Sequence, residues 1–158
     1  TILLSSVFHM TGLDGRVFSP MHLPVLLAGF IVGPIWALMV GVLAPVLSFV
    51  LNNGMPPVPT LFVMMFELGM YGLFSGLFYN YLRLTILPSL LSAMIIGRLA
   101  GGGFSFLLSK LFGFDIGFTA FLKASVIIAL PAIILQVVLV PIMVKVYFKS
   151  KNVTARYL

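Results

Sequence analysis

The stretch LAGFIVGPIWALMVGVLAPVLSFVL (residues 27–51) decides the fold, because it belongs to a longer run from Met21 to Phe66 that contains no charged residue. So long an uncharged and mostly apolar run is typical of segments buried in lipid. Gly33 and Pro34 interrupt it, and so does the later segment NNGMPP (residues 52–57). Since glycine and proline end or bend helices, we expect several short membrane-spanning helices here rather than one long helix.

The composition of the whole chain supports a membrane protein. Of its residues 61% are hydrophobic and 8% are charged, and its mean hydropathy is +1.23. A chain of 158 residues, with about 20 apolar residues per crossing, has room for about five or six helices and for no separate catalytic domain. A transmembrane β-barrel would show alternating apolar and polar residues, which these runs lack. We therefore expect a single all-α domain over residues 1–158, a bundle of six transmembrane helices.

Breaker residues and charges place these helices along the chain. We expect the end of a first helix, truncated in this sequence, over residues 1–10, and further helices over about 20–33, 34–51 with a kink near Pro45, 60–81, 84–112 and 117–148. Gly69, Gly72 and Gly76 are spaced for close contact between helices. The boundary at residues 33–34 decides how many times the chain crosses the membrane, because a kink there instead of a break would leave five crossings.

The basic residues predict how the protein sits in the membrane. Lys145, Lys149, Lys151 and Arg156 follow the last apolar run, a position typical of the cytoplasmic side. Six crossings would then place both termini, and the loop at Arg83, in the cytoplasm of a prokaryotic cell. The net charge of +6 is explained by this placement, so we expect no nucleic-acid partner. The chain has no cysteine, which excludes disulfides and cysteine metal sites.

Three ionisable residues inside the apolar runs suggest a binding site. Each charge in a bilayer costs about 2.5 to 3.5 kcal/mol and usually has a partner or a task. Counted along the helices, Glu67, Arg98 and Lys123 lie at similar depths in the outer half. Two cations and one anion leave a surplus positive charge that would favour a ligand with one carboxylate. The alternative is that Glu67 and Arg98 form a structural pair while Lys123 extends toward the membrane surface.

Catalytic and metal chemistry are not expected. The chain offers no nucleophile with a neighbouring base and no metal-binding motif on a helix, so we predict no enzyme activity, no metal and no cofactor. His9, Asp14 and His22 are too irregularly spaced to fix a metal geometry. His22 has two open interpretations, contact with a ligand or packing between helices.

An ordered set of short motifs marks the first half of the chain. SPMHLPVLLAGF (residues 19–30) is followed by GP (33–34), GMPP (54–57), FEL (66–68), YG (71–72) and SG (75–76). This order resembles the substrate-binding S components of energy-coupling factor (ECF) vitamin transporters. The similarity is strongest over residues 18–79 and is greatest to the pantothenate-type members.

The resemblance implies a function and partners. An S component captures a vitamin or a vitamin precursor from outside the cell. It docks on a transmembrane coupling subunit carried by two cytoplasmic ATPases, and it is thought to topple in the membrane to deliver its ligand. Pantothenate is the favoured ligand, and folate, riboflavin and hydroxymethylpyrimidine are the alternatives within the family. A stand-alone secondary transporter or a channel is the alternative outside it. The small-residue docking motif of the family's first helix does not occur in residues 1–10.

The resemblance also implies a site, built from outer loops and the outer ends of the later helices. Arg98 and Lys123 are the first candidates to bind a carboxylate, and Asn53 and Tyr71 to bind hydroxyl or amide groups. Mapped by position, the full set of candidates is Asp14, Arg16, His22, Asn52, Asn53, Glu67, Tyr71, Arg98 and Lys123.

Overall fold

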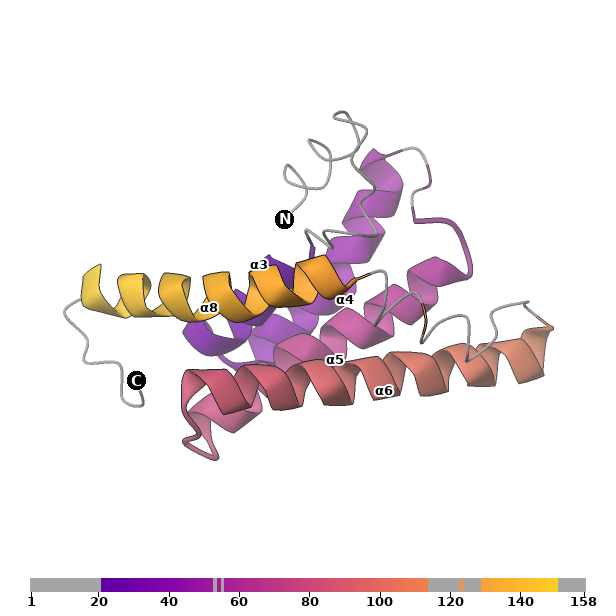
Figure 1. The fold of residues 1–158 in the computed structure, drawn as a ribbon. Helices are drawn as coiled ribbons and strands as arrows, with labels where there is room; N and C mark the ends of the chain where they lie inside the picture. Colours follow the sequence, from indigo (N-terminus) through magenta and orange to yellow (C-terminus); the bar gives the residue numbers. More distant parts are fainter. Residues whose placement is uncertain (1–20, 53, 55, 114–122, 124–128, 151–158) are drawn as a thin grey trace.

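The structure is a computed structural model that describes residues 21–52, 54, 56–113, 123 and 129–150. Within these residues it has five α-helices: α3 (His22–Ile31), α4 (Pro34–Leu51), α5 (Thr60–Asn80), α6 (Ile86–Phe112) and α8 (Leu130–Ser150) (Figure 1). The helices α4, α5, α6 and α8 are long and apolar enough to cross a membrane. The described part of the chain therefore confirms an all-helical membrane fold, but it does not confirm six crossings.

The break predicted at residues 33–34 is confirmed. The helix α3 ends at Ile31, and Gly33 has a φ of 107°. Residues other than glycine rarely adopt this backbone conformation. Pro34 then begins α4, where its missing N–H and its fixed φ suit the first turn of a helix. With 10 residues, α3 is about half the length needed to cross a bilayer by itself.

The last helix begins later than the sequence predicts. We expected one helix over residues 117–148, whereas α8 starts at Leu130, and Ala129 before it accepts the first helical hydrogen bond, from Ile133 N at 2.9 Å. Pro131 accounts for this start, because proline has no N–H to donate to a preceding turn and is favoured near a helix N-terminus. Of the residues between Gly113 and Ala129, only Lys123 is described.

Glycines bring three helix backbones into direct contact. A Cβ placed on Gly41 of α4 would lie 2.3 Å from the carbonyl oxygen of Leu68 in α5, and a Cβ on Gly72 of α5 would lie 2.3 Å from that of Ala37 in α4. No side chain fits between helices at this distance, which is the packing that small residues permit in membranes. We call the four glycines of α3, α4 and α5 at such contacts the glycine seam: Gly29, Gly41, Gly72 and Gly76.

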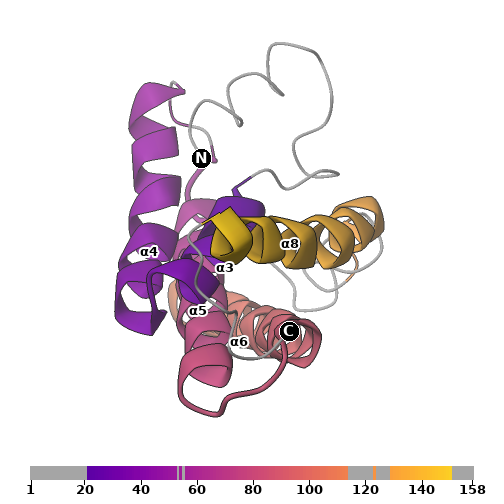
Figure 2. The ribbon, with the colours of Figure 1, turned by 90° about the vertical axis from the view of Figure 1, so that its left-hand side faces the viewer.

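The helix α3 lies at the centre of the described helices. It runs between α5 and α8, with α6 beside α5, while α4 is steeply inclined to α6 and α8 (Figures 1 and 2). Val25, Leu26 and Phe30 of α3 are completely or almost completely buried. They join one apolar cluster with residues of α5, α6 and α8: Leu68, Tyr71, Tyr79, Ile86, Leu90, Met94, Val140 and Val144.

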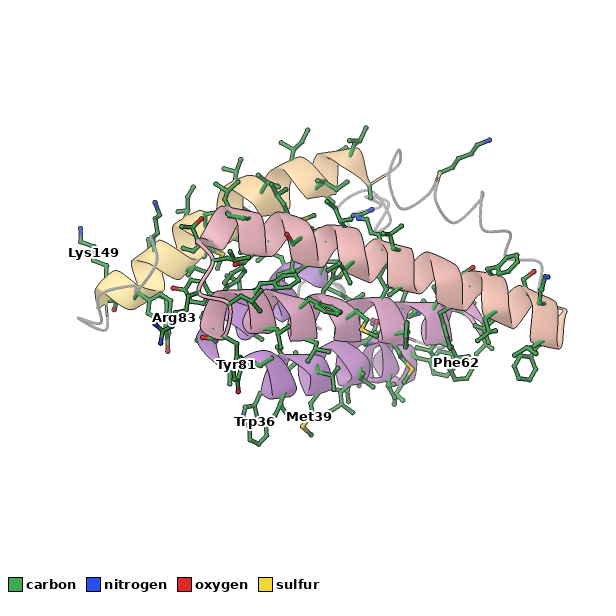
Figure 3. All side chains as sticks on the ribbon, turned by 90° about the horizontal axis from the view of Figure 1, so that it is seen from below. Trp36, Met39, Phe62, Tyr81, Arg83 and Lys149 are labelled. Atoms are coloured by element: carbon green, nitrogen blue, oxygen red, sulfur yellow. The ribbon has the colours of Figure 1, made fainter. Side chains whose placement is uncertain are left out.

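The outer faces of the helices are apolar. On α4 the exposed face includes Ile35, Trp36, Met39, Leu43 and Leu47, and Figure 3 shows Trp36 and Met39 pointing away from the other helices. In water an apolar surface of this extent would drive association. In a bilayer the acyl chains cover it, so this surface is the one expected of a membrane-embedded protein.

Candidate functional site

A buried polar pair lies on α5. The Tyr71 hydroxyl donates a hydrogen bond of 2.8 Å to Glu67 Oε1, and both side chains are buried. Residues four apart share one face of an α-helix, so the spacing of the two residues places them side by side. The bond supplies a donor to the glutamate carboxyl, whose side chain is buried.

The Tyr71 ring is held between two other helices. From α3, the His22 ring lies with its centroid 5.2 Å from that of Tyr71, inclined by 56°. From α6, Gly97 lies so close that an added Cβ would be 2.4 Å from Tyr71 Cδ1. Gly97 therefore leaves the space that the tyrosine ring fills.

Arg98 follows Gly97 on α6 and is buried, with 9% of its surface exposed. Because Gly97 lies against the Tyr71 ring, Arg98 lies on α6 at the level of the Tyr71 side chain. Within the described residues no ion pair joins Arg98 to Glu67, and Arg98 Nη1 has no hydrogen-bond partner. The guanidinium therefore has donor capacity left for an acceptor that these residues do not supply.

We call His22, Glu67, Tyr71 and Arg98 the Tyr71 cluster. The cluster contains one buried carboxyl and one buried guanidinium, and a buried charge is costly unless it is paired and hydrogen-bonded. No group of three or more potential metal ligands occurs in the described part of the chain. The cluster has the groups to bind a small polar molecule: a guanidinium for a carboxylate, and a hydroxyl and an imidazole for neutral polar groups.

Other candidate residues lie elsewhere or are not described. Lys123 is exposed, so it does not lie among the buried side chains near Arg98, and its role in ligand binding stays a prediction. A long aliphatic stem lets lysine reach a polar surface, whereas helical rise predicts only its depth. The Asn52 amide donates to Ser48 Oγ at 3.0 Å on its own helix, and the end of α4 lies apart from α6 in both views (Figures 1 and 2). Asp14, Arg16 and Asn53 lie outside the described residues.

A buried polar residue that the site prediction missed is Gln136. It is 1% exposed, and its Nε2 atom has no hydrogen-bond partner among the described residues. With Ala132 and Val140 it forms the buried face of α8, which packs on α3 and α6. The sequence could have indicated this residue, because Gln136 is the only polar side chain between Leu130 and Val144.

A sequence model of the family described as ECF transporter, substrate-specific component, matches residues 1–144. No curated protein and no solved structure matches the chain. The matched residues include the whole Tyr71 cluster and the glycine seam.

Proposed function

The chain belongs to the family of ECF transporter substrate-specific components, and we propose that it binds a vitamin inside the membrane, with the Tyr71 cluster forming part of the site. Membership implies a substrate-binding subunit of a transporter rather than an enzyme. It also implies a small-molecule substrate, a coupling subunit and ATPase partners. The chain itself supplies the binding step.

The observation that carries the proposed site is the buried Arg98 guanidinium. Its Nη1 atom has no partner within the described residues, although the side chain is buried. An unpaired buried donor on a charged group costs about 1 to 3 kcal/mol or more, so an arrangement of this kind favours a ligand that supplies the acceptor. A carboxylate supplies two acceptor oxygens to a guanidinium at once.

Pantothenate is the ligand that we propose first. Its single carboxylate suits Arg98, and its hydroxyl and amide groups suit Tyr71 and His22. The similarity to pantothenate-type members points to the same ligand. Riboflavin and hydroxymethylpyrimidine are neutral and would leave the guanidinium unpaired, while folate carries more charge and a large ring system. With Lys123 exposed, the preference rests on Arg98 and no longer on a surplus of two cations.

For delivery we propose the toppling movement of the family, with capture from outside and both termini in the cytoplasm. The exposed faces of α4 and α8 are apolar over most of their length. A body with this surface can turn within lipid at limited desolvation cost, because few charged groups have to leave water.

The test of ligand binding uses the purified protein in detergent and a panel of pantothenate, folate, riboflavin and hydroxymethylpyrimidine. A ligand present at 100 times its Kd stabilises the folded state by about 2.7 kcal/mol, which a thermal-shift assay detects. Arg98→Met should weaken pantothenate binding by roughly 10- to 150-fold in calorimetry, the equivalent of one charged hydrogen bond. Lys110→Met, an exposed cation on the same helix, is the matched control. Equal affinity in the two variants would remove Arg98 from the site.

A transport assay separates this function from that of a stand-alone transporter or channel. We expect the purified chain in liposomes to bind ligand without moving it across the bilayer. Uptake should begin only when the coupling subunit, the two ATPases and ATP are added. Uptake by the chain alone would contradict the proposed function even if ligand binding were confirmed.

A further inference from the structure

We propose that one end of the molecule is a binding surface for anionic phospholipid headgroups. Arg83 lies in the turn after α5, and Lys145 and Lys149 lie in the last two turns of α8. All three side chains are exposed, and Figure 3 shows Arg83 and Lys149 at the same end of the molecule. We call Arg83, Lys145 and Lys149 the basic rim.

Aromatic side chains place the basic rim at the level of the lipid headgroups. Trp36, at the start of α4, is 61% exposed, and Tyr81, at the end of α5, is 70% exposed. Figure 3 shows both on the side of the molecule where Arg83 lies. Exposed tryptophan and tyrosine gather at membrane interfaces, because their rings prefer the acyl chains while their polar atoms reach water. Cations next to them therefore meet the phosphate layer.

The two halves of the basic rim are held together by packing. Phe148 of α8 lies between the two lysines in sequence, and its ring centroid is 6.3 Å from that of Tyr79 in α5. The Tyr79 ring in turn meets Phe30 of α3 at 5.2 Å. These contacts fix the last turns of α8 beside the end of α5, from which the Arg83 turn follows.

Arg83 has a backbone conformation that few residues other than glycine adopt. Its φ is 58°, in the left-handed region. Hydrogen bonds on both sides define the turn, from Leu82 N to Leu77 O at 3.2 Å and from Leu84 N to Phe78 O at 3.1 Å. An arginine in a turn that would suit glycine better indicates that its side chain has a role there, since the backbone alone does not favour it.

The positive charge at this end is not compensated within the described residues. The chain has three acidic residues, and the described one, Glu67, is buried in the Tyr71 cluster. Three exposed cations without a neighbouring described carboxylate complement the negative surface of a membrane that contains anionic lipid. This inference is independent of the vitamin site, because it uses none of its residues.

The test uses Trp36, the only tryptophan in the chain, as a fluorescent reporter at the same end. The purified protein in an uncharged detergent is titrated with dioctanoyl phosphatidylglycerol, dioctanoyl phosphatidylcholine or glycerol phosphate. We expect a saturable change with phosphatidylglycerol at far lower concentration than with the other two. Arg83→Gln should weaken it about fivefold, and the combined change of all three rim residues to glutamine roughly a hundredfold. Added salt should weaken it as well.

Lys110→Gln is the matched control, because Lys110 is exposed near the opposite end of α6. It should bind phosphatidylglycerol as the wild type does, and circular dichroism of all variants should be unchanged, since none of the replaced side chains is buried. Equal binding of phosphatidylglycerol and phosphatidylcholine would overturn the proposal. So would a loss in Lys110→Gln equal to that in Arg83→Gln. Glycerol phosphate that competes with phosphatidylglycerol at an equal concentration would show a site for free phosphate instead of a lipid surface. This result would overturn the proposal too.

Discussion

Replacing Gly97 by alanine tests whether α6 holds the Tyr71 ring in place. The added Cβ would lie 2.4 Å from Tyr71 Cδ1 and 2.6 Å from Cε1. Carbon atoms pack at about 3.5 to 4.0 Å, so the ring or the helix must move by more than about 1 Å. The ring has little room to do so, because it is completely buried, lies against His22 and is hydrogen-bonded to Glu67.

The expected cost of Gly97→Ala follows from these contacts. Overpacking a filled core costs about 1 to 3 kcal/mol. In a protein of this size about 1 kcal/mol lowers Tm by about 2 to 4 °C. We therefore expect a Tm lower by roughly 2 to 12 °C in a thermal unfolding scan in detergent. If the proposed site is correct, calorimetry should also show weaker binding of pantothenate, because a shifted Tyr71 hydroxyl no longer aligns the Glu67 carboxyl.

A glycine on the same helix provides the control. Gly103 is exposed, and a Cβ added there would meet no atom within 4 Å. Because alanine favours a helix over glycine by up to about 1 kcal/mol, Gly103→Ala should leave Tm unchanged or raise it. In a Tyr71→Ala background the ring is gone, and Gly97→Ala should then cost no more than the control. A Tm for Gly97→Ala alone equal to that of Gly103→Ala would refute the reasoning.

Three further predictions follow from the same structure. Gly72→Ala should lower Tm more than Gly97→Ala and reduce the yield of folded protein. The added Cβ would lie 2.3 Å from the Ala37 carbonyl oxygen, and a backbone atom cannot move to another rotamer as a side chain can. A Tm equal to that of the wild type would contradict the close packing at the glycine seam. Tyr71→Phe should lower Tm by the equivalent of about 1 to 3 kcal/mol, since it removes the donor to Glu67; an unchanged Tm would show that the bond adds no net stability. Fluorescence of Trp36 should be quenched more strongly by lipids brominated near the headgroup than by lipids brominated near the chain end, and the reverse order would place the start of α4 deep in the bilayer.

Much of the fold could be predicted from the sequence because apolar runs and breaker residues fix helix bounds in a membrane. The bounds of α4 match the prediction at both ends, and those of α5 differ by one residue at the C-terminal end. The late start of α8 was missed, because Pro131 lies inside an apolar run and can be read either as a kink or as a first-turn residue.

The burial of the candidate site residues was predicted in part, whereas their role in binding stays a prediction. Counting helical rise selected Glu67 and Arg98, and both side chains are buried. Lys123, which the same count placed at a similar depth, is exposed, because helical rise gives the depth of a residue and not the side of the helix on which it lies. The hydrogen bond between Tyr71 and Glu67 could have been predicted, because residues four apart lie on the same face of a helix. The contact between Gly97 and Tyr71 could not have been predicted, since it depends on how α5 and α6 cross.

The glycine seam also limits how the protein can change shape. If α4 slid along α5 by one residue, a larger side chain would take the place of a glycine where two backbones touch, and the helices would be forced apart. The helices α3, α4 and α5 therefore cannot slide past one another in small steps, and they have to move as one rigid body. Rearrangements that admit and release a small molecule then fall to α6 and α8, which contribute no glycine to the seam.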